Sequence, residues 1–383
     1  MLAALVSCGK QDDVYKEFIV DGGHVYPAKV RDLSSVSGYQ RVILTWTRPF
    51  DPSLKTAKVF WDNFSQSVDL NYADFPDDNV SVVIANLEDR SYTFDVVNYD
   101  AKGNQSLSTE LSVTPFGNNW LVSHTERSVV SSRMDGTDAK IVMTKSTKDM
   151  VATKFRYQTA DGRTVESEYL EPEDVEISLP EALRGKRFEF KSAFLPSSGI
   201  DTVWATSWSV SPDAIVYPLP TEGWTVSVTD GQEFGAYTCD LILDGVIAAA
   251  NRWQSSHTAA IQRNFPKILV IDTKMEAGQE YSFTDFVLYQ NPSNVTTLRY
   301  LREFSIFVGN EPFDPNDTDA MQRFGTPVIT ASGNRNEDAC SVVLPASATG
   351  RYVAIVFTNS YSTSGWLDLW ELVPYGYWGV DAN

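Results

Sequence analysis

The sequence contains little histidine, little cysteine and no long apolar run. Its 383 residues include 3 cysteines and 3 histidines, which are His24, His124 and His257. It has no His-Glu-x-x-His, no Gly-x-Ser-x-Gly and no glycine-rich phosphate loop, which are common signatures of metalloproteases, esterases and nucleotide-binding enzymes. A transmembrane helix needs about 18 consecutive apolar residues, and no such run is present. The sequence therefore predicts neither these enzymes nor a membrane-spanning protein.

Basic residues are also scarce relative to acidic ones. The chain has 31 lysines and arginines against 50 aspartates and glutamates, and its formal net charge is −19. A nucleic-acid surface needs clustered Lys and Arg to release counterions, and negative charge also disfavours adsorption to anionic lipid. We therefore expect no nucleic-acid partner, and membrane contact only through an anchor. Neutral ligands such as carbohydrate remain open, and so does calcium, which takes oxygen ligands.

Strand patterns fill most of the chain, whereas sustained helical periodicity is nearly absent. In the segment RVILTWT, Val42, Leu44 and Trp46 share one face, which is the period of a half-buried strand. Ser81–Leu87 and Tyr92–Asp100 continue the pattern, with turns rich in Asp, Asn and Gly between them. Together with 10 tryptophans and 17 tyrosines, these short strands predict an all-β protein built from sandwiches.

An internal repeat and a linker divide the chain. Val59–Trp61 lies 96 residues before Phe155–Tyr157, and Tyr92–Phe94 lies 96 residues before Phe188–Phe190. A shared offset predicts two copies of one sandwich. The proline-containing segment Ile215–Trp224 separates them from a third domain. The expected ranges are a tether over 1–23, sandwiches over 24–116 and 117–217, and a C-terminal domain over 218–383.

The N-terminal residues MLAALVSC are similar to the lipobox of a bacterial lipoprotein. The apolar stretch is shorter than usual and no basic residues precede it. The resemblance implies that Cys8 carries a lipid and that the protein is anchored to the outer membrane, facing either the outside or the periplasm. The alternative is an apolar N-terminus with one buried cysteine.

The first sandwich resembles a fibronectin type III domain. Trp46 matches the core tryptophan of that fold, and Leu87 followed by Tyr92 and Phe94 resembles its tyrosine corner. The stretch from Val25 to Asp62 is also similar to an N-terminal domain of uncharacterised function in Bacteroidetes lipoproteins. There the domain follows the lipid anchor and precedes a binding domain, so the resemblance implies a spacer without chemistry.

The C-terminal domain resembles the coagulation-factor 5/8 type C, or discoidin, family over about 150 residues. Five segments carry the resemblance in order, namely LILDGVIAAANRWQSS, FPKILVIDT, LREFSIFVGNE, GRYVAIVFTNS and LDLWELVPYG. The family implies a jelly-roll β-sandwich whose loops at one end hold the ligand. Bacterial members act mostly as carbohydrate-binding modules of the family 32 type, whereas animal members bind phospholipid or protein. The expected architecture is two fibronectin type III-like sandwiches followed by a discoidin-type jelly roll.

The resemblance also implies one structural Ca²⁺ and no organic cofactor. The positions that match the family's calcium ligands are Asp244, in the Asp-Gly loop, and Glu371, near the C-terminus. Carboxylates on two loops can contribute to an oxygen cage around the ion. The alternative is that Asp244 only caps the Asp-Gly turn while Glu371 is solvated.

Sugar sites combine an aromatic platform with a few convergent polar groups. Trp253 matches a tryptophan that packs inside the family's sandwich, so we predict a core position for it. Tyr361 lies in a loop rich in Ser, Thr and Gly, and we predict that it is exposed and stacks on the sugar. Trp366 begins a predicted strand, and whether it lies in the core or serves as a platform for the sugar is left open. The predicted ligand-binding residues are Gln254, His257, Arg299, Tyr300, Asn359, Tyr361 and Trp366, and the same segments contain Arg252, Arg263, Asn291 and Asn294.

Once three β-domains are assigned, no large catalytic domain remains, so we predict that the chain is not an enzyme. The favoured hypothesis is a lipid-anchored cell-surface protein whose C-terminal module captures carbohydrate, an oligosaccharide or polysaccharide, for a nutrient-uptake system. The alternative is a non-catalytic adhesion or structural lipoprotein that binds a protein partner, for example within an outer-membrane complex. Whether Cys239 and Cys340 form a disulfide is left open, because spacing alone does not decide it.

Overall fold

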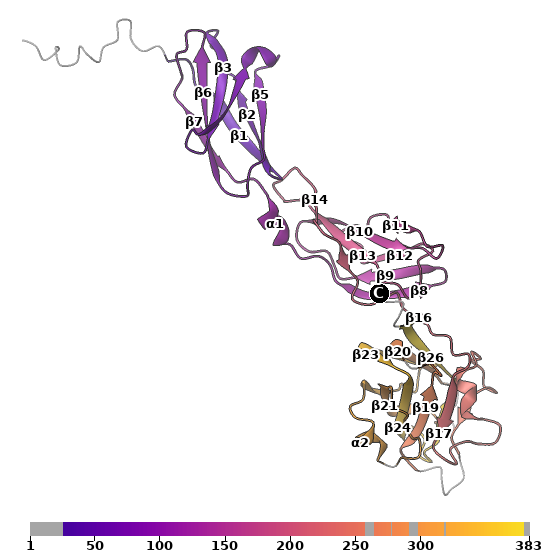
Figure 1. Ribbon diagram of the computed structural model, residues 1–383. Coiled ribbons are helices and arrows are strands. Elements are labelled where there is room, and N and C mark those ends of the chain that lie inside the picture. Colours follow the sequence, from indigo (N-terminus) through magenta and orange to yellow (C-terminus); the bar gives the residue numbers. More distant parts are fainter. Residues whose placement is uncertain (1–25, 257–263, 277, 291–297, 318, 379–383) are drawn as a thin grey trace, which may run out of the picture. The chain divides into compact units, whose positions relative to one another are not determined.

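The computed structural model describes residues 26–256, 264–276, 278–290, 298–317 and 319–378 (Figure 1). Strands dominate this part of the chain, so the predicted all-β fold is confirmed. Within the same residues, no helix combines the length and the apolar character needed to cross a bilayer. One compact unit comprises the described residues up to Thr125 together with Thr147–Val151 and Ala193–Ala205. The other comprises Glu126–Ser146, Ala152–Ser192 and the described residues from Thr206 onward.

The first sandwich packs a three-stranded sheet, in the order β1-β2-β5, against a four-stranded sheet in the order β4-β3-β6-β7. All of these pairings are antiparallel. The strands are β1 (Arg31–Gly38), β2 (Arg41–Thr47), β3 (Leu54–Trp61), β4 (Gln66–Asn71), β5 (Asn79–Ala85), β6 (Tyr92–Asp100) and β7 (Thr109–Val113), with a 3-10 helix η3 (Tyr72–Asp74) and a short helix α1 (Asn118–Val122).

Alternation in β2 buries Trp46 against the second sheet, as the sequence pattern predicts. Its indole Nε1 donates to the Tyr72 hydroxyl at 3.4 Å, and that hydroxyl donates to the Asn98 side-chain oxygen at 2.5 Å. The Tyr92 hydroxyl accepts a hydrogen bond from the backbone N–H of Glu88 at 3.0 Å. A tyrosine hydroxyl bonded to the backbone a few residues upstream is the tyrosine corner of such sandwiches, and its predicted presence is confirmed.

The second sandwich repeats this topology. Its three-stranded sheet has the order β12-β9-β8, and its other sheet has the order β11-β10-β13-β14, with β15 also paired to β13. Leu54 begins β3 and Met150 begins β10, 96 residues later, so the predicted repeat joins equivalent strands. The strands are β8 (Val129–Asp135), β9 (Asp138–Met143), β10 (Met150–Gln158), β11 (Thr164–Glu166), β12 (Glu176–Leu179), β13 (Glu189–Phe194), β14 (Val203–Trp204) and β15 (Ser209–Val210).

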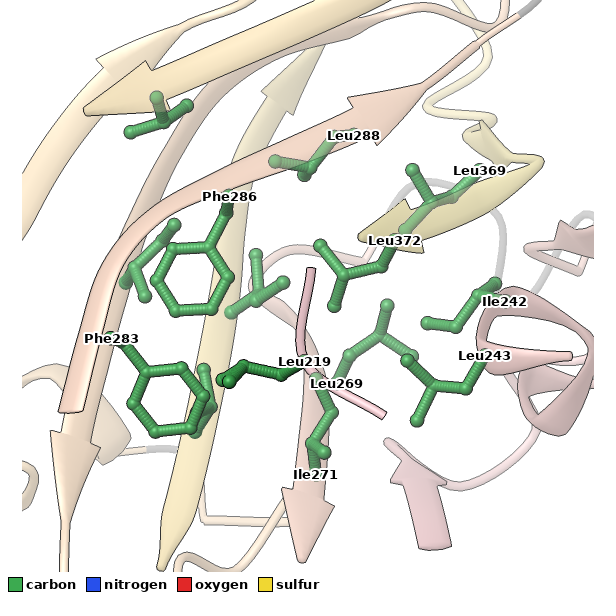
Figure 2. Close-up of a cluster of buried hydrophobic side chains, with 14 of the residues drawn as sticks. Leu219, Ile242, Leu243, Leu269, Ile271, Phe283, Phe286, Leu288, Leu369 and Leu372 are labelled. Atoms are coloured by element: carbon green, nitrogen blue, oxygen red, sulfur yellow. The ribbon is translucent and has the colours of Figure 1, made fainter. Parts of the chain in front are cut away.

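The C-terminal domain packs a five-stranded sheet, β17-β19-β24-β21-β22, against a four-stranded sheet, β16-β26-β20-β23. Figure 2 shows the core between them, where Phe283, Phe286 and Leu288 of β20 lie in one cluster with Leu269 and Ile271 of β19. The elements are β16 (Tyr217–Pro218), β17 (Thr225–Val228), the 3-10 helix η4 (Cys239–Leu243), β18 (Trp253–Gln254), β19 (Lys267–Asp272), β20 (Tyr281–Tyr289), β21 (Leu301–Gly309), α2 (Ala320–Arg323), β22 (Ile329–Ser332), β23 (Ala339–Gly350), β24 (Tyr352–Ser360), β25 (Asp368–Leu369) and β26 (Glu371–Trp378).

A small two-stranded ribbon, β18 with β25, ties the loops of this domain to its core. Trp253 in β18 is fully buried, stacks on Phe357 and donates from its indole Nε1 to the Gln232 carbonyl at 2.8 Å. The predicted core position of Trp253 is therefore confirmed. Because Trp253 fixes β18, the next residue, Gln254, is held directly opposite Asp368 of β25.

The two cysteines of the C-terminal domain are separate, buried thiols. Cys239 lies in η4, where its thiol is 3.6 Å from the Val226 carbonyl oxygen. Burial and the neighbouring Glu233 raise the pKa of the Cys239 thiol to about 12. Cys340 lies in β23, and burial also raises the pKa of its thiol.

Candidate functional site

The polar groups of the C-terminal domain converge on the β18–β25 ribbon. The side-chain oxygen of Gln254 accepts hydrogen bonds from two guanidinium groups, from Arg252 at 2.9 Å and from Arg299 at 2.7 Å. The backbone N–H of Asp368 donates to the Arg299 carbonyl at 3.1 Å, which brings the loop before β21 against the ribbon. Arg252 also donates to the Ala249 carbonyl. One amide oxygen therefore orients two arginines that come from different loops.

A buried carboxylate balances part of this charge. Oδ2 of Asp368 lies 3.4 Å from Nε of Arg252 and 3.2 Å from Nε of Arg299. The Asp368 side chain is only 3% exposed, and its other oxygen, Oδ1, has no hydrogen-bond partner among the described residues. Burial raises the pKa of Asp368 to about 6, although the charges of Arg299 and Arg252 pull it down. We call Arg252, Gln254, Arg299 and Asp368 the arginine cluster.

Two aromatic rings flank the arginine cluster. The Arg252 guanidinium carbon lies 3.9 Å from the centre of the Tyr237 ring, and that of Arg299 lies 5.6 Å from the centre of the Trp366 ring. Both rings are partly exposed. Trp366 is therefore neither a core residue nor a bare surface platform, because it borders the cluster with part of its surface accessible.

The other predicted residues lie around the cluster or away from it. Tyr361 is only partly exposed, because its hydroxyl donates to the Gly333 carbonyl at 3.2 Å and the Arg302 guanidinium lies 5.5 Å from its ring centre. Asn359 is partly buried, and its side-chain oxygen accepts from the backbone N–H of Ser360 at 2.9 Å. Tyr300 is in the interior. The remaining predicted or neighbouring positions, His257, Arg263, Asn291, Asn294 and the lipidation candidate Cys8, lie outside the described residues.

The predicted calcium residues lie close to one another near the start of β26. In the Asp-Gly loop, the Asp244 carboxylate accepts from the backbone N–H of Val246 at 2.9 Å and from the Asn251 amide nitrogen at 2.8 and 2.9 Å. That nitrogen also lies 3.2 Å from the Val246 carbonyl and 3.4 Å from the Leu241 carbonyl. Four oxygen atoms thus converge on the side-chain amide of Asn251, which has an amide oxygen of its own.

Glu371 lies beside the Asp-Gly loop and interacts electrostatically with Asp244. Its Oε1 accepts from the backbone N–H of Gly245 at 3.2 Å, while Oε2 is buried without a hydrogen-bond partner in the described part of the chain. Burial, and then repulsion from Asp244, raise the pKa of Glu371 to about 7. Among the described residues no three side chains of His, Cys, Asp or Glu gather into a metal cluster, so carbonyl and amide oxygens have to supply the other ligands. Such a mixed oxygen set fits Ca²⁺, which takes six to eight oxygens.

The strands and the site define the class of this chain as a modular all-β protein of β-sandwich domains with a polar and aromatic cluster on its last domain. The family model that matches is DUF4998, described as a domain of unknown function, over residues 8–203. Because this match covers half of the chain, the chain belongs to the DUF4998 family. The match covers the first sandwich and the second as far as the start of β14, and so extends beyond the Val25–Asp62 segment that resembles an uncharacterised domain. No curated protein matches the chain.

Among solved structures, the chain is similar to the family 32 carbohydrate-binding module of C. perfringens NanJ in complex with galactose, at 16% identity and TM-score 0.33, over 42% of this chain and 99% of that one. It is similar to a SusE-like protein at 11% identity and TM-score 0.36, over 66% of this chain and 97% of that one. It is also similar to a two-domain fibronectin type III segment of chicken tenascin at 12% identity and TM-score 0.20, over 46% of this chain and 97% of that one.

Sequence reasoning missed three residues of these sites. Asp368 lies within the apolar segment Leu367–Trp370, where an acid on a short buried strand is the signal that could have identified it. Tyr237 follows the Gly-containing loop before η4 and carries no local pattern that marks it. Asn251 stands seven residues after Asp244, and an amide close to an Asp-Gly loop is a recognisable addition to an oxygen-rich site.

Proposed function

We propose that the protein is a non-catalytic, lipid-anchored carbohydrate-binding protein of the cell surface, and that its C-terminal domain holds the sugar at the arginine cluster. The observation that carries the proposal is the buried Asp368 carboxylate, whose Oδ1 has no hydrogen-bond partner among the described residues, between two arginines and beside partly exposed aromatic rings. A buried acceptor in this state requires a donor. A hydroxyl group, from water or from a bound sugar, is such a donor.

The chemistry of the cluster suits saccharide hydroxyls. Guanidinium groups donate several hydrogen bonds in a fixed plane, and Gln254 orients both of them. The apolar faces of sugar rings pack on aromatic side chains, and Tyr237 and Trp366 supply such rings on either side. Binding sites typically combine apolar surface with a few converging polar groups in this way. Arg252, Arg299 and Trp366 would contact the sugar, and Oδ1 of Asp368 would accept from one of its hydroxyls. Gln254 would position the two arginines.

We further propose that the oxygen group around Asn251 holds a Ca²⁺ ion. Its ligands would be the carboxylates of Asp244 and Glu371 and the carbonyls of Leu241 and Val246. The Asn251 amide, whose nitrogen faces these oxygens, would turn to present its side-chain oxygen to the ion. The ion would cross-link the Asp-Gly loop to β26 and offset the repulsion between the two carboxylates. Because the same loop leads into β18, a fixed Asp-Gly loop would also hold Arg252 in place.

Affinity electrophoresis of the full chain through gels containing single polysaccharides tests the saccharide proposal. We expect at least one neutral polysaccharide to retard the protein, and Arg299→Gln to reduce the retardation at least tenfold. Arg335→Gln, which removes the same charge at an exposed position of the same domain, is the matched control and should leave the mobility shift unchanged. If no polysaccharide retards the protein and no glycan of an array binds it, the proposal is overturned and the protein-binding alternative is favoured.

Membrane attachment is tested separately, in a bacterial host that processes lipoproteins. The full chain should fractionate with the outer membrane, and Cys8→Ser should release it because the acceptor of the lipid is lost. Surface location is then measured by adding a protease to intact cells. A Cys8→Ser protein that stays in the membrane fraction would contradict the anchor.

A further inference from the structure

The second sandwich has a basic face in an otherwise acidic chain. Side chains alternate along a strand, and outward positions on β10 and β13, which are neighbours in one sheet with β11 (Figure 1), carry several cations. The short strand β15 also pairs with β13. Lys154 and Arg156 extend from β10, Arg187 lies two residues before β13, and Lys191 extends from β13. Glu166 of β11 and Glu189 of β13 share this surface. The Glu126 carboxylate lies at its edge, where it accepts from the backbone N–H of Ser192 and from the Ser209 hydroxyl. We call Lys154, Arg156, Arg187, Lys191 and Trp208 the basic face.

Trp208 organises two of these cations. It lies next to β15, which pairs with β13, so its ring stands beside Lys191. The Arg156 guanidinium carbon is 4.5 Å from the Trp208 ring centre, and the Lys191 ammonium nitrogen is 4.6 Å from it. Cation–π contacts of this length hold a cation over the face of an aromatic ring. One partly exposed indole therefore fixes two cations on adjacent strands.

The acids of this surface neutralise only part of the charge. Glu166 pairs with Lys154, and Nε of Arg156 donates to Glu189 at 2.6 Å. The pKa of Glu166 is lowered first by its hydrogen bond with Lys154, and the charges of Lys191 and Arg156 act in the same direction. Several cations thus converge around a single carboxylate. The surface keeps a local positive excess although the whole chain has a net charge of −19.

A shallow hollow borders this surface and includes Arg156 and Arg187 of the basic face. Its volume is about 230 Å³, and it is lined by Arg156, Tyr157, Gln158, Thr164, Lys186, Arg187 and Glu189. That is smaller than the roughly 300–1,000 Å³ of pockets that enclose a small molecule. Neighbouring strands of a sheet lie about 4.8 Å apart, and the cations of the basic face stand on neighbouring strands. An open, repeated array of this kind matches anionic groups repeated along a chain better than one enclosed anion.

We propose that the basic face binds an anionic polysaccharide, one that carries sulfate or carboxylate groups on its sugars. Exposed charges farther away than a Debye length of about 8–10 Å are largely screened at physiological salt, so the acidic remainder of the chain does not prevent local binding. Nucleic acid fits less well, because single strands need open aromatic rings for base stacking and the Trp208 ring is already engaged by two cations. This site is on a different domain from the arginine cluster and does not depend on it.

Affinity electrophoresis of the full chain tests the proposal with five probes: dextran sulfate, polygalacturonate, neutral dextran, polyglutamate and single-stranded DNA. We expect retardation by dextran sulfate, by polygalacturonate or by both, and little by neutral dextran or polyglutamate. The double variant Arg187→Gln/Lys191→Gln should raise the dissociation constant for the retarding probe at least tenfold. It should also flatten the dependence of affinity on salt, since fewer counterions are released. Equal retardation by polyglutamate or by single-stranded DNA would overturn the assignment to a saccharide.

Lys140→Gln/Lys145→Gln is the matched control, because it removes the same charge from β9 and the loop after it. It should change the dissociation constant less than twofold, and an equal loss in both double variants would show a general charge effect and overturn the site. Trp208→Phe should keep most of the affinity and Trp208→Ala should lose it, with thermal unfolding as the check on folding. If Trp208→Ala does not fold, the comparison of Arg187→Gln/Lys191→Gln with Lys140→Gln/Lys145→Gln still tests the site. Arg299→Gln should leave this binding unchanged, which separates it from the sugar site of the C-terminal domain.

Discussion

Asp368 is a single carboxylate whose surroundings oppose its charge. It is nearly fully buried, and two arginines approach one of its oxygens while the other has no hydrogen-bond partner among the described residues. Removing a carboxylate from water is costly, and attraction to partners offsets that cost only when the geometry is good. Here desolvation exceeds the attraction, so the pKa of Asp368 rises to about 6.

This raised pKa predicts how Asp368 affects stability. Between about pH 4 and pH 6 the folded protein keeps a proton on Asp368 that the unfolded chain has lost. The stabilisation is fully present below about pH 4 and is lost as the pH rises through about 6. The loss reaches about 3 kcal/mol in the free energy of unfolding, on the order of 1.4 kcal/mol per pH unit. Urea unfolding of wild type and Asp368→Asn from pH 4 to 7.5 measures it.

As the pH rises from 4 to 7.5, the free energy of unfolding of the wild type should fall relative to that of Asp368→Asn, because only the wild type titrates at this position. Asp338→Asn, at an exposed site of the same domain, is the control and should follow the wild-type curve. A constant difference between wild type and Asp368→Asn across the range would contradict the burial effect.

Trp253 stabilises the C-terminal domain through packing in its core. Its side chain is fully buried, stacks on Phe357 and satisfies its N–H on the Gln232 carbonyl. Trp253→Ala should lower the free energy of unfolding of the C-terminal domain by about 3–5 kcal/mol, because it leaves a cavity. Calorimetry of the full chain checks this as a shift of one transition. Val343→Ala, at a position that is 68% exposed, should shift it little.

At the scale of elements, the tyrosine corner of the first sandwich gives a local test. Tyr92→Phe removes the hydroxyl that accepts from the Glu88 N–H and keeps the ring in the core. We expect a loss of about 1 kcal/mol, the usual contribution of one hydrogen bond, measured by chemical denaturation. For Tyr99→Phe, whose hydroxyl makes no such corner bond within the described part of the chain, the change should be below about 0.5 kcal/mol. Equal losses in the two variants would show that the corner adds nothing.

The strands were the most predictable elements, for a physical reason. Burial alternates with a period of two in β2, so Val42, Leu44 and Trp46 reveal the inner face without knowledge of any partner strand. The repeat of 96 residues likewise located equivalent strands in the two sandwiches. Contacts between distant segments were not predictable. Tyr361 was expected to be exposed, but its hydroxyl reaches the Gly333 carbonyl, 28 residues away.

The candidate site was predictable only in part for the same reason. Gln254 and Arg299 were selected as loop residues with suitable side chains, yet the amide that orients Arg299 is 45 residues away. Asp368 was not selected, since an acid on a buried strand acquires its role only when the two arginines arrive from other loops. Local sequence reports which face of a strand is apolar, and it does not report which charges will meet across loops.

At the scale of the whole molecule, calcium should stabilise one domain and leave the others unchanged. An ion that binds only the folded state at 100 times its dissociation constant adds about 2.7 kcal/mol. For a domain of 150–250 residues each kcal/mol raises the melting temperature by about 2–4 °C. Chelation should therefore lower one calorimetric transition of the full chain by about 5–10 °C. Glu371→Gln should abolish the response, and Glu276→Gln, at an exposed position, should preserve it.

The separate thiols of Cys239 and Cys340 mean that the C-terminal domain has no covalent cross-link that a reductant could break. Its stability comes from the packed core in Figure 2, so it should fold equally well in reducing and oxidising compartments. The thiolate is the reactive form of cysteine, and a thiol pKa of about 12 keeps Cys239 protonated at neutral pH. Thiol-directed dyes should thus spare this position in the folded protein, and an engineered surface cysteine in this domain would be labelled selectively.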